Sequence, residues 1–162
     1  GTDDYLKIIE GKTASLIKTS AKLGAMASEC KQETISSISK WAWHSGIIFQ
    51  ITDDILDLSS DEKTLGKPSG NDIIEGTYTL PVLIALEKYP EKINKILSDS
   101  SENKVGVNEV INEFNNDEII SESKLFLKTH LEKSESAAKE IDNKTVRNIL
   151  LDINTYLIER SN

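Results

Sequence analysis

The distribution of helix-breaking residues constrains the fold of this 162-residue chain more than any other feature. The chain contains only three prolines and eight glycines, and their densest group lies between residues 66 and 81. Long stretches free of both residues lie on either side, and such stretches are typical of helices. No segment alternates between apolar and polar residues for long enough to indicate a sheet. The sequence therefore predicts an all-α fold.

Apolar residues that recur at helical spacing predict the helices of the first half. A first helix is expected from Tyr5 onward. Its expected apolar face consists of Leu6, Ile9, Thr13, Leu16, Ile17 and Ala21. A second, long helix is expected from about Gln32 to Leu58. Its expected stripe consists of Ile35, Ile38, Ala42, Ser45, Phe49, Thr52 and Leu56, with Trp41, Ile48 and Ile55 beside it.

The second half predicts shorter helices after an ordered loop over residues 59–76. A helix is expected to begin near Thr79 and end before Pro90, because Pro81 suits a first turn. Two short helical pieces are expected within 91–116, then two amphipathic helices at about 117–142 and 144–160. The expected apolar positions of these last two helices are Ile120, Leu127, Leu131, Ile149, Ile153 and Leu157.

Charge and composition exclude several classes of function. The formal net charge of −8 argues against nucleic acid and against an anionic membrane surface, since both attract lysine and arginine. No apolar run approaches the ~18 residues that a membrane-spanning helix needs, and the first residues lack a signal-peptide pattern, so a cytoplasmic location is expected. One cysteine, Cys30, excludes an internal disulfide, and two histidines exclude a histidine-rich metal site.

The sharpest chemical feature is the acidic run Asp53-Asp54-Ile55-Leu56-Asp57. On a helix, Asp53 and Asp57 lie one turn apart on the same face, and Asp54 lies at its edge. Two carboxylates ~5 Å apart repel by about 3 kcal/mol at an effective dielectric of 20, so a half-buried cluster requires a cation. Carboxylate oxygens suit Mg²⁺, which usually binds one or two of them and completes its shell with water and phosphate. A solvated acidic turn is the alternative.

The neighbouring segment favours the functional interpretation. Nine residues after Asp57, the segment Gly66-Lys67-Pro68-Ser69-Gly70-Asn71-Asp72 predicts a tight loop from which Lys67 can reach a phosphate held by the metal. The spacing is not that of a phosphate-binding loop of the nucleotide-hydrolase kind, and no strand precedes it. An acidic cluster and a basic loop together predict a diphosphate site.

These segments together resemble the signature of the polyprenyl synthetases, the trans-isoprenyl diphosphate synthases. In this chain the signature segments are Phe49–Asp57 (FQITDDILD), Gly66–Asp72 (GKPSGND) and Thr79–Pro81 (TLP). Upstream, Tyr5–Leu16 is similar to the family's lysine-threonine helix, and Tyr156–Arg160 is similar to its usual C-terminal ending. The resemblance covers nearly the whole chain and implies a single partial domain over residues 1–162, the C-terminal half of the isoprenoid-synthase helical bundle.

The resemblance also implies roles for individual residues. Those implied to contact the allylic diphosphate are Lys12, Thr13, Gln50 and Lys67. Asp53, with Asp57 or Asp54 alongside, is implied to bind Mg²⁺, and Asp72 to support the loop and the metal's waters. In the reaction that the resemblance implies, pyrophosphate leaves as an allylic carbocation forms, isopentenyl diphosphate attacks the cation, and loss of a proton gives a product five carbons longer. Without the resemblance, Thr13 as a helix-interior residue and Gln50 as a polar core contact are equally acceptable interpretations.

Two departures from the family pattern leave alternatives open. The family's first aspartate-rich motif and its isopentenyl diphosphate site are not in this sequence, and Thr77 stands where many members have lysine. We therefore expect a homodimer or a heteromer to supply an N-terminal half, and little activity from this chain alone. A non-catalytic, diphosphate-binding or regulatory subunit is the main alternative. A terpene cyclase is disfavoured by the glycine-lysine-proline loop that directly follows the aspartates.

Overall fold

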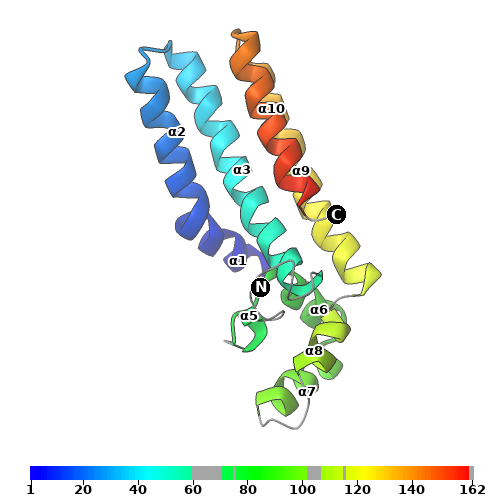
Figure 1. Cartoon of the computed structure of the whole chain (residues 1–162). Helices are drawn as coiled ribbons and strands as arrows, with labels where there is room; N and C mark the ends of the chain where they lie inside the picture. Colours follow the sequence, from blue (N-terminus) through cyan, green and yellow to red (C-terminus); the bar gives the residue numbers. More distant parts are fainter. Residues whose placement is uncertain (60–70, 75, 102–106, 115, 161–162) are drawn as a thin grey trace. The chain divides into compact units, whose positions relative to one another are not determined.

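The computed structural model describes residues 1–59, 71–74, 76–101, 107–114 and 116–160 (Figure 1). Every regular element in these ranges is a helix, which confirms the all-α prediction. In chain order the elements are α1 (Thr2–Ile9), the π-helix η1 (Glu10–Ala14), α2 (Ser15–Ala27), α3 (Gln32–Ser59), α5 (Asn71–Ile74), α6 (Leu80–Lys88), α7 (Pro90–Ser101), α8 (Val107–Phe114), α9 (Asp117–Lys139) and α10 (Lys144–Glu159).

Most of the expected helices form close to their expected bounds. The long helix α3 ends one residue beyond the expected Leu58, and α6 begins and ends as expected around Pro81 and before Pro90. The loop expected over 59–76 contains the short helix α5, whereas residues 60–70 lie outside the described part. Within the described ranges, no helix is both long and apolar enough to cross a membrane.

The chain divides into two compact units, each of which is described by itself. The bundle unit comprises Asp3–Thr52 and Phe126–Asn162, and the aspartate unit comprises Gly1–Thr2 and Asp53–Leu125. The long helices α3 and α9 each contribute to both units.

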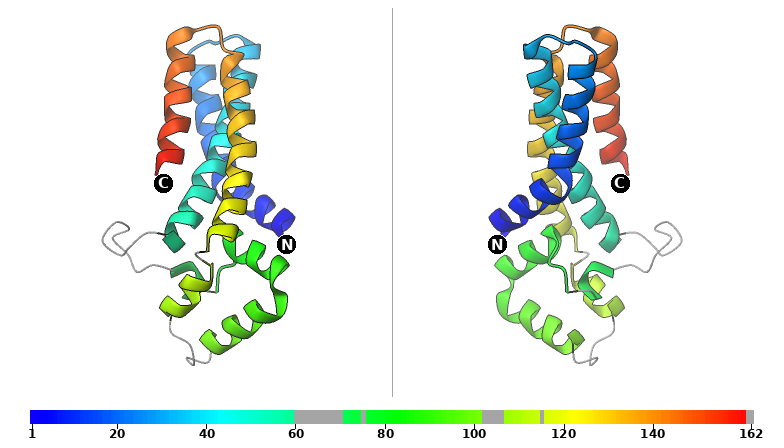
Figure 2. Two further views of the ribbon diagram at one scale, coloured as in Figure 1. Left: turned by 90° about the vertical axis from the view of Figure 1, so that its right-hand side faces the viewer. Right: turned by 90° about the vertical axis from the view of Figure 1, so that its left-hand side faces the viewer.

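In the bundle unit, α2, α3, α9 and α10 lie side by side (Figures 1 and 2). The indole Nε1 of Trp41 donates to the backbone carbonyl of Leu150 at 3.2 Å, which ties α3 to α10. Trp41 is 7% exposed, so its ring packs against neighbouring helices. The buried cluster around it consists of Trp41, Ala42, Ala137, Ala138, Ile141 and Leu150.

The apolar face expected at the start of the chain is wrong at Leu16. That side chain is 68% exposed, whereas Ala14, which was not expected on the face, is fully buried. The reason is the π-helix η1, whose wider turn gives a spacing of five positions rather than four from the buried Ile9 to the buried Ala14. A strictly α-helical period therefore selects a wrong residue after this turn.

Of the three apolar positions expected on α10, Leu157 is buried as expected, whereas Ile149 and Ile153 are wrong by one residue. Ile149 and Ile153 are 52% and 38% exposed. The buried positions of this helix are Leu150, Asn154 and Leu157. Asn154 turns inward because its side-chain oxygen accepts a hydrogen bond from the buried hydroxyl of Ser45 at 2.8 Å.

In the aspartate unit, α6, α7 and α8 pack against one another. Their fully buried side chains include Leu80, Val82, Ile84, Ala85, Ile93, Val110 and Phe114. Helix α6 starts at an extended Thr79, whose side chain makes no capping hydrogen bond, so another group must satisfy the first N–H groups of this helix.

Candidate functional site

The residues expected at the site fall in both units. Lys12, Thr13 and Gln50 belong to the bundle unit, and the expected metal ligands belong to the aspartate unit. Lys67 lies outside the described residues, so its expected contact with diphosphate remains a prediction.

Two of the expected diphosphate ligands in the bundle unit bind each other. The Thr13 hydroxyl donates to the side-chain oxygen of Gln50 at 2.8 Å, across the two helices η1 and α3. Lys12, the residue before Thr13, is exposed, so its ammonium group is accessible to an anion. Thr13 and Gln50 therefore hold each other in place through this polar contact. Their expected contact with diphosphate remains a prediction.

The π-helix that carries Lys12 and Thr13 is a feature that the sequence interpretation missed. Single π turns within helices are frequently found at functional sites, because they re-aim side chains on the wider turn. In the sequence, a spacing of five between the apolar residues Ile9 and Ala14, in place of the usual three or four, was the available signal.

Gly46 is the residue that allows α3 to approach η1. A Cβ atom at this position would lie 2.6 Å from the Cα of Ala14 and 3.0 Å from its Cβ. Gln50 lies one turn further along α3, so the same close approach brings its side chain within hydrogen-bonding distance of Thr13. The absence of a side chain at Gly46 therefore allows the hydrogen bond between Thr13 and Gln50 to form.

At the end of α3, two of the three motif aspartates are buried and support the elements that follow. Asp54 is 3% exposed, and its carboxylate accepts the backbone N–H of Leu80, the first residue of α6, at 3.4 Å. Asp57 is 2% exposed, and its carboxylate accepts the backbone N–H of Asp72 in α5 at 3.4 Å. A negative charge at the start of a helix is favourable, because the exposed N–H groups there carry partial positive charge.

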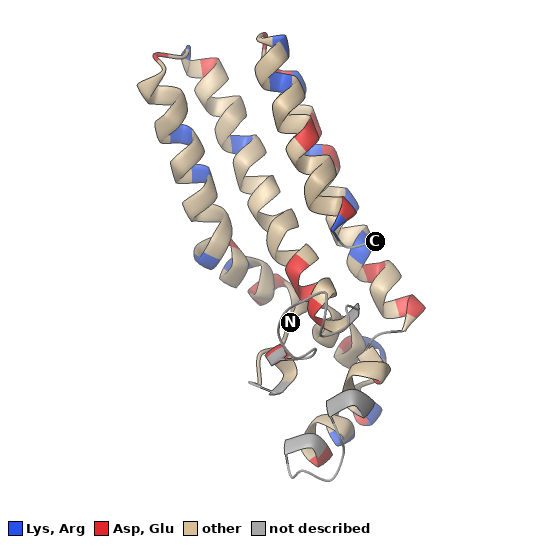
Figure 3. Ribbon diagram, in the orientation of Figure 1, with Lys and Arg blue, Asp and Glu red and all other residues tan. Residues whose placement is uncertain are grey.

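Asp53 differs from these two aspartates because it is half-exposed at the same end of α3. The acidic residues of α3 gather mainly at this C-terminal end (Figure 3). Within the part of the chain that the structure describes, no three histidine, cysteine, aspartate or glutamate side chains form a preformed metal cage. The carboxylates present still fit Mg²⁺, which takes one or two carboxylates and completes its shell with water and phosphate oxygens.

The backbone of Asp72 makes two hydrogen bonds that hold the segment around α5 in place. Its N–H donates to Asp57, and its carbonyl accepts the N–H of Thr77 at 2.7 Å, just after α5. Gly76 precedes Thr77 with a φ of 73°, a conformation that glycine adopts without steric cost. The segment that follows the loop is thus held by backbone hydrogen bonds, while the expected role of the Asp72 carboxylate toward metal waters remains a prediction.

Comparison with known proteins identifies the family. The family model of the polyprenyl synthetases matches residues 1–114, which is more than half of the chain. The chain belongs to the polyprenyl synthetase family. The sequence resemblance is thereby confirmed.

Relatives of this polyprenyl synthetase chain are synthases of prenyl diphosphates. Heptaprenyl diphosphate synthase component 2 of Bacillus subtilis is 33% identical over 156 residues, which are 96% of this chain and 45% of the relative. Geranylgeranyl diphosphate synthase of Saccharolobus solfataricus is 32% identical over 147 residues, 91% of this chain and 42% of the relative.

A solved structure of the same kind has the same fold. Heptaprenyl diphosphate synthase from Staphylococcus aureus matches with a TM-score of 0.91 and 32% identity, over 100% of this chain and 51% of that one. This polyprenyl synthetase chain therefore spans about half the length of the relatives that it matches.

Proposed function

We propose that this polyprenyl synthetase chain takes part in the condensation of an allylic diphosphate with isopentenyl diphosphate, and that it contributes the diphosphate-binding end of α3. The family match carries the proposal. The half-exposed Asp53 and the paired Thr13 and Gln50 support it, because they provide an acidic metal ligand and two positioned polar groups.

In this proposal the exposed Lys12 binds the allylic diphosphate. Its ammonium group offsets the charge that builds up on the diphosphate as it leaves, and Thr13 and Gln50 orient it through hydrogen bonds. Lys67 is proposed to bind the same group from the loop after α3. Asp53, with Asp57 or Asp54 alongside, would hold Mg²⁺ together with the diphosphate, and Asp72 would support the metal's waters. The carboxylates of Asp54 and Asp57 also accept backbone N–H groups from α6 and α5. When bound, Mg²⁺ supplies charge neutralisation of the leaving pyrophosphate.

A second candidate function is that of one subunit in a heteromeric synthase. The name of the Bacillus subtilis relative describes it as component 2 of its enzyme, which supports a second component there. In this form the chain is a non-catalytic subunit that binds diphosphate in a regulatory role, and the partner chain carries out the turnover. Substituting Asp53 in the assembled enzyme distinguishes the two candidates, because a merely regulatory subunit should keep most of its activity.

The binding part of the proposal is tested by calorimetry with inorganic pyrophosphate. We expect binding in the presence of Mg²⁺ that weakens at least about tenfold in Asp53→Ala, since even residues outside the metal's ligand shell affect affinity by that much. Asp152→Ala is the matched control, because Asp152 is an exposed aspartate of α10 and should leave the heat unchanged. Equal heats with and without Mg²⁺ would contradict the proposal.

The catalytic part is tested with the purified 162-residue chain, an allylic diphosphate and isopentenyl diphosphate. We expect no product above background from this chain alone, because the first aspartate-rich motif of the family is not in this sequence. Product that requires Mg²⁺ and disappears in Asp53→Ala would show that the chain is sufficient by itself. That result would overturn the expected need for a second chain, but not the role of Asp53.

A further inference from the structure

The sequence contains two histidines, and both lie in the bundle unit. His44 belongs to α3 and His130 to α9, and their Nδ1 atoms are 3.1 Å apart. The ring centroids are 5.2 Å apart with 60° between the ring planes. Two imidazole nitrogens from different helices therefore face each other, although the proposed diphosphate chemistry uses neither.

Both rings are neutral at physiological pH. Burial lowers the pKa of His44 to about 4, with a smaller contribution from His130, and burial likewise lowers the pKa of His130 to about 4. The neutral ring is the form of histidine that binds metals. A direct hydrogen bond between the two rings needs one Nδ1 to carry a proton, whereas a metal between them needs two unprotonated Nδ1 atoms.

The separation of the two nitrogens suits a tetrahedral metal ion. Two zinc–nitrogen bonds of ~2.05 Å at a tetrahedral angle hold their nitrogens about 3.3 Å apart. The observed 3.1 Å needs only a small adjustment, with a rotation of the rings that directs both lone pairs to one point. We propose that His44 and His130 form a two-histidine site for a borderline divalent cation such as Zn²⁺, which links α3 to α9.

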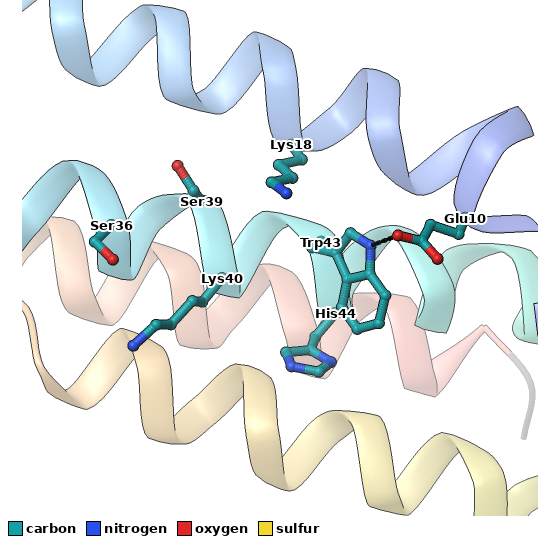
Figure 4. A pocket seen from close by; sticks show the side chains of 7 residues that line it. All are labelled: Glu10, Lys18, Ser36, Ser39, Lys40, Trp43 and His44. Carbon is teal, nitrogen blue, oxygen red and sulfur yellow. Dashed lines mark hydrogen bonds between the residues drawn. The ribbon is translucent and has the colours of Figure 1, made fainter. Parts of the chain in front are cut away.

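The surroundings of the pair leave room for the remaining ligands. His44 lines a cavity of about 350 Å³ that opens between α2 and α3, together with Trp43, Lys18, Lys40 and Glu10 (Figure 4). His130 is not among the residues that line this cavity, so in the proposed site water from it would complete the coordination on the side of His44. No third histidine, cysteine or carboxylate of the described residues joins the cluster, so the protein supplies two ligands only.

The charged neighbours limit the affinity of this site. The Lys133 ammonium acts on both rings and opposes a cation, but it is exposed on α9 and screened by solvent. The Glu10 carboxylate, which lines the same cavity as His44 and accepts from the Trp43 indole at 3.3 Å, supplies a counter-charge (Figure 4). Imidazole ligands favour zinc, nickel and copper over magnesium, so the site should discriminate against Mg²⁺.

The test is calorimetric titration of the whole chain with zinc chloride in excess Mg²⁺, which occupies the carboxylates. We expect zinc binding that falls at least about tenfold in both His44→Gln and His130→Gln, since each removes one ligand. Cys30→Ser is the matched control, because Cys30 carries the only thiol of the sequence, and its loss should leave zinc binding unchanged. Zinc binding that is undetectable, or equal in the wild type and both histidine variants, would overturn the proposal.

A second measurement needs no variant. Nitrogen-15 spectra of the wild type with labelled histidine contain signals from these two rings alone. Under the proposal, zinc moves the Nδ1 resonances of both residues and leaves Nε2 less affected. Unchanged Nδ1 resonances at a zinc concentration that saturates the calorimetric signal would mean that the pair is an ordinary hydrogen bond. Neither readout depends on pyrophosphate, so the result is separate from the proposed function.

Discussion

Replacement of Gly46 by alanine should lower the free energy of unfolding by about 1–3 kcal/mol, the usual cost of overpacking. The added Cβ would lie 2.6 Å from the Cα of Ala14. Since the nearest atom is backbone, a change of side-chain rotamer cannot relieve the contact, and η1 and α3 must separate. The helix propensity of alanine offsets only about 1 kcal/mol of this loss. Urea denaturation followed by circular dichroism measures the difference.

The matched control for this substitution is Gly24→Ala in α2. A Cβ at Gly24 meets no atom within 4 Å, so the same chemical change should stabilise the helix by about 0.5–1 kcal/mol. Separation of η1 and α3 should also break the bond between Thr13 and Gln50, which lies one turn from Gly46. If Gly46→Ala were as stable as Gly24→Ala, the close approach of these helices would not be a constraint on the fold.

The sequence predicts the helices themselves well because their signals are local. The stripe of α3 and Pro81 at the start of α6 are read from neighbouring residues, and both helices form where expected. The π turn is not local in this sense. Its extra residue lets Ala14, rather than Leu16, face Gly46 on a helix far along the chain. The spacing of five between Ile9 and Ala14 marks a break in the helical period, but the contact with Gly46 that accompanies the π turn is seen only in the structure.

At the candidate site, too, the sequence pattern does not show contacts with residues that lie far along the chain. The spacing of Asp53, Asp54 and Asp57 predicts their positions around α3, but not that two of them are buried. Burial depends on the backbone N–H groups of Asp72 and Leu80, which arrive from helices later in the chain. The motif therefore identifies the acidic end of α3. Only the structure shows that Asp54 and Asp57 are buried there and that Asp53 is half-exposed.

The polar core of the bundle unit explains why α10 turns Asn154 inward. Ser45, Ser134 and Asn154 are all buried, and they come from α3, α9 and α10. The two hydroxyls lie 2.9 Å apart, and the Asn154 amide donates to Ser134 at 3.0 Å. Ser134 also lies 3.3 Å from the carbonyl of Trp41, so the network joins three helices in one register.

Replacement of Asn154 by leucine should therefore destabilise the chain by about 2–3 kcal/mol, because it leaves buried hydroxyls with fewer partners. Asn148→Leu, an exposed position of the same helix, should change stability by no more than about 0.5 kcal/mol. The triple variant that adds Ser45→Ala and Ser134→Ala should lose less stability than the three single changes summed, since removing a whole network leaves nothing unsatisfied. Additive losses in urea denaturation would instead mean that the three residues act independently, and that the register of α10 is set by its apolar contacts.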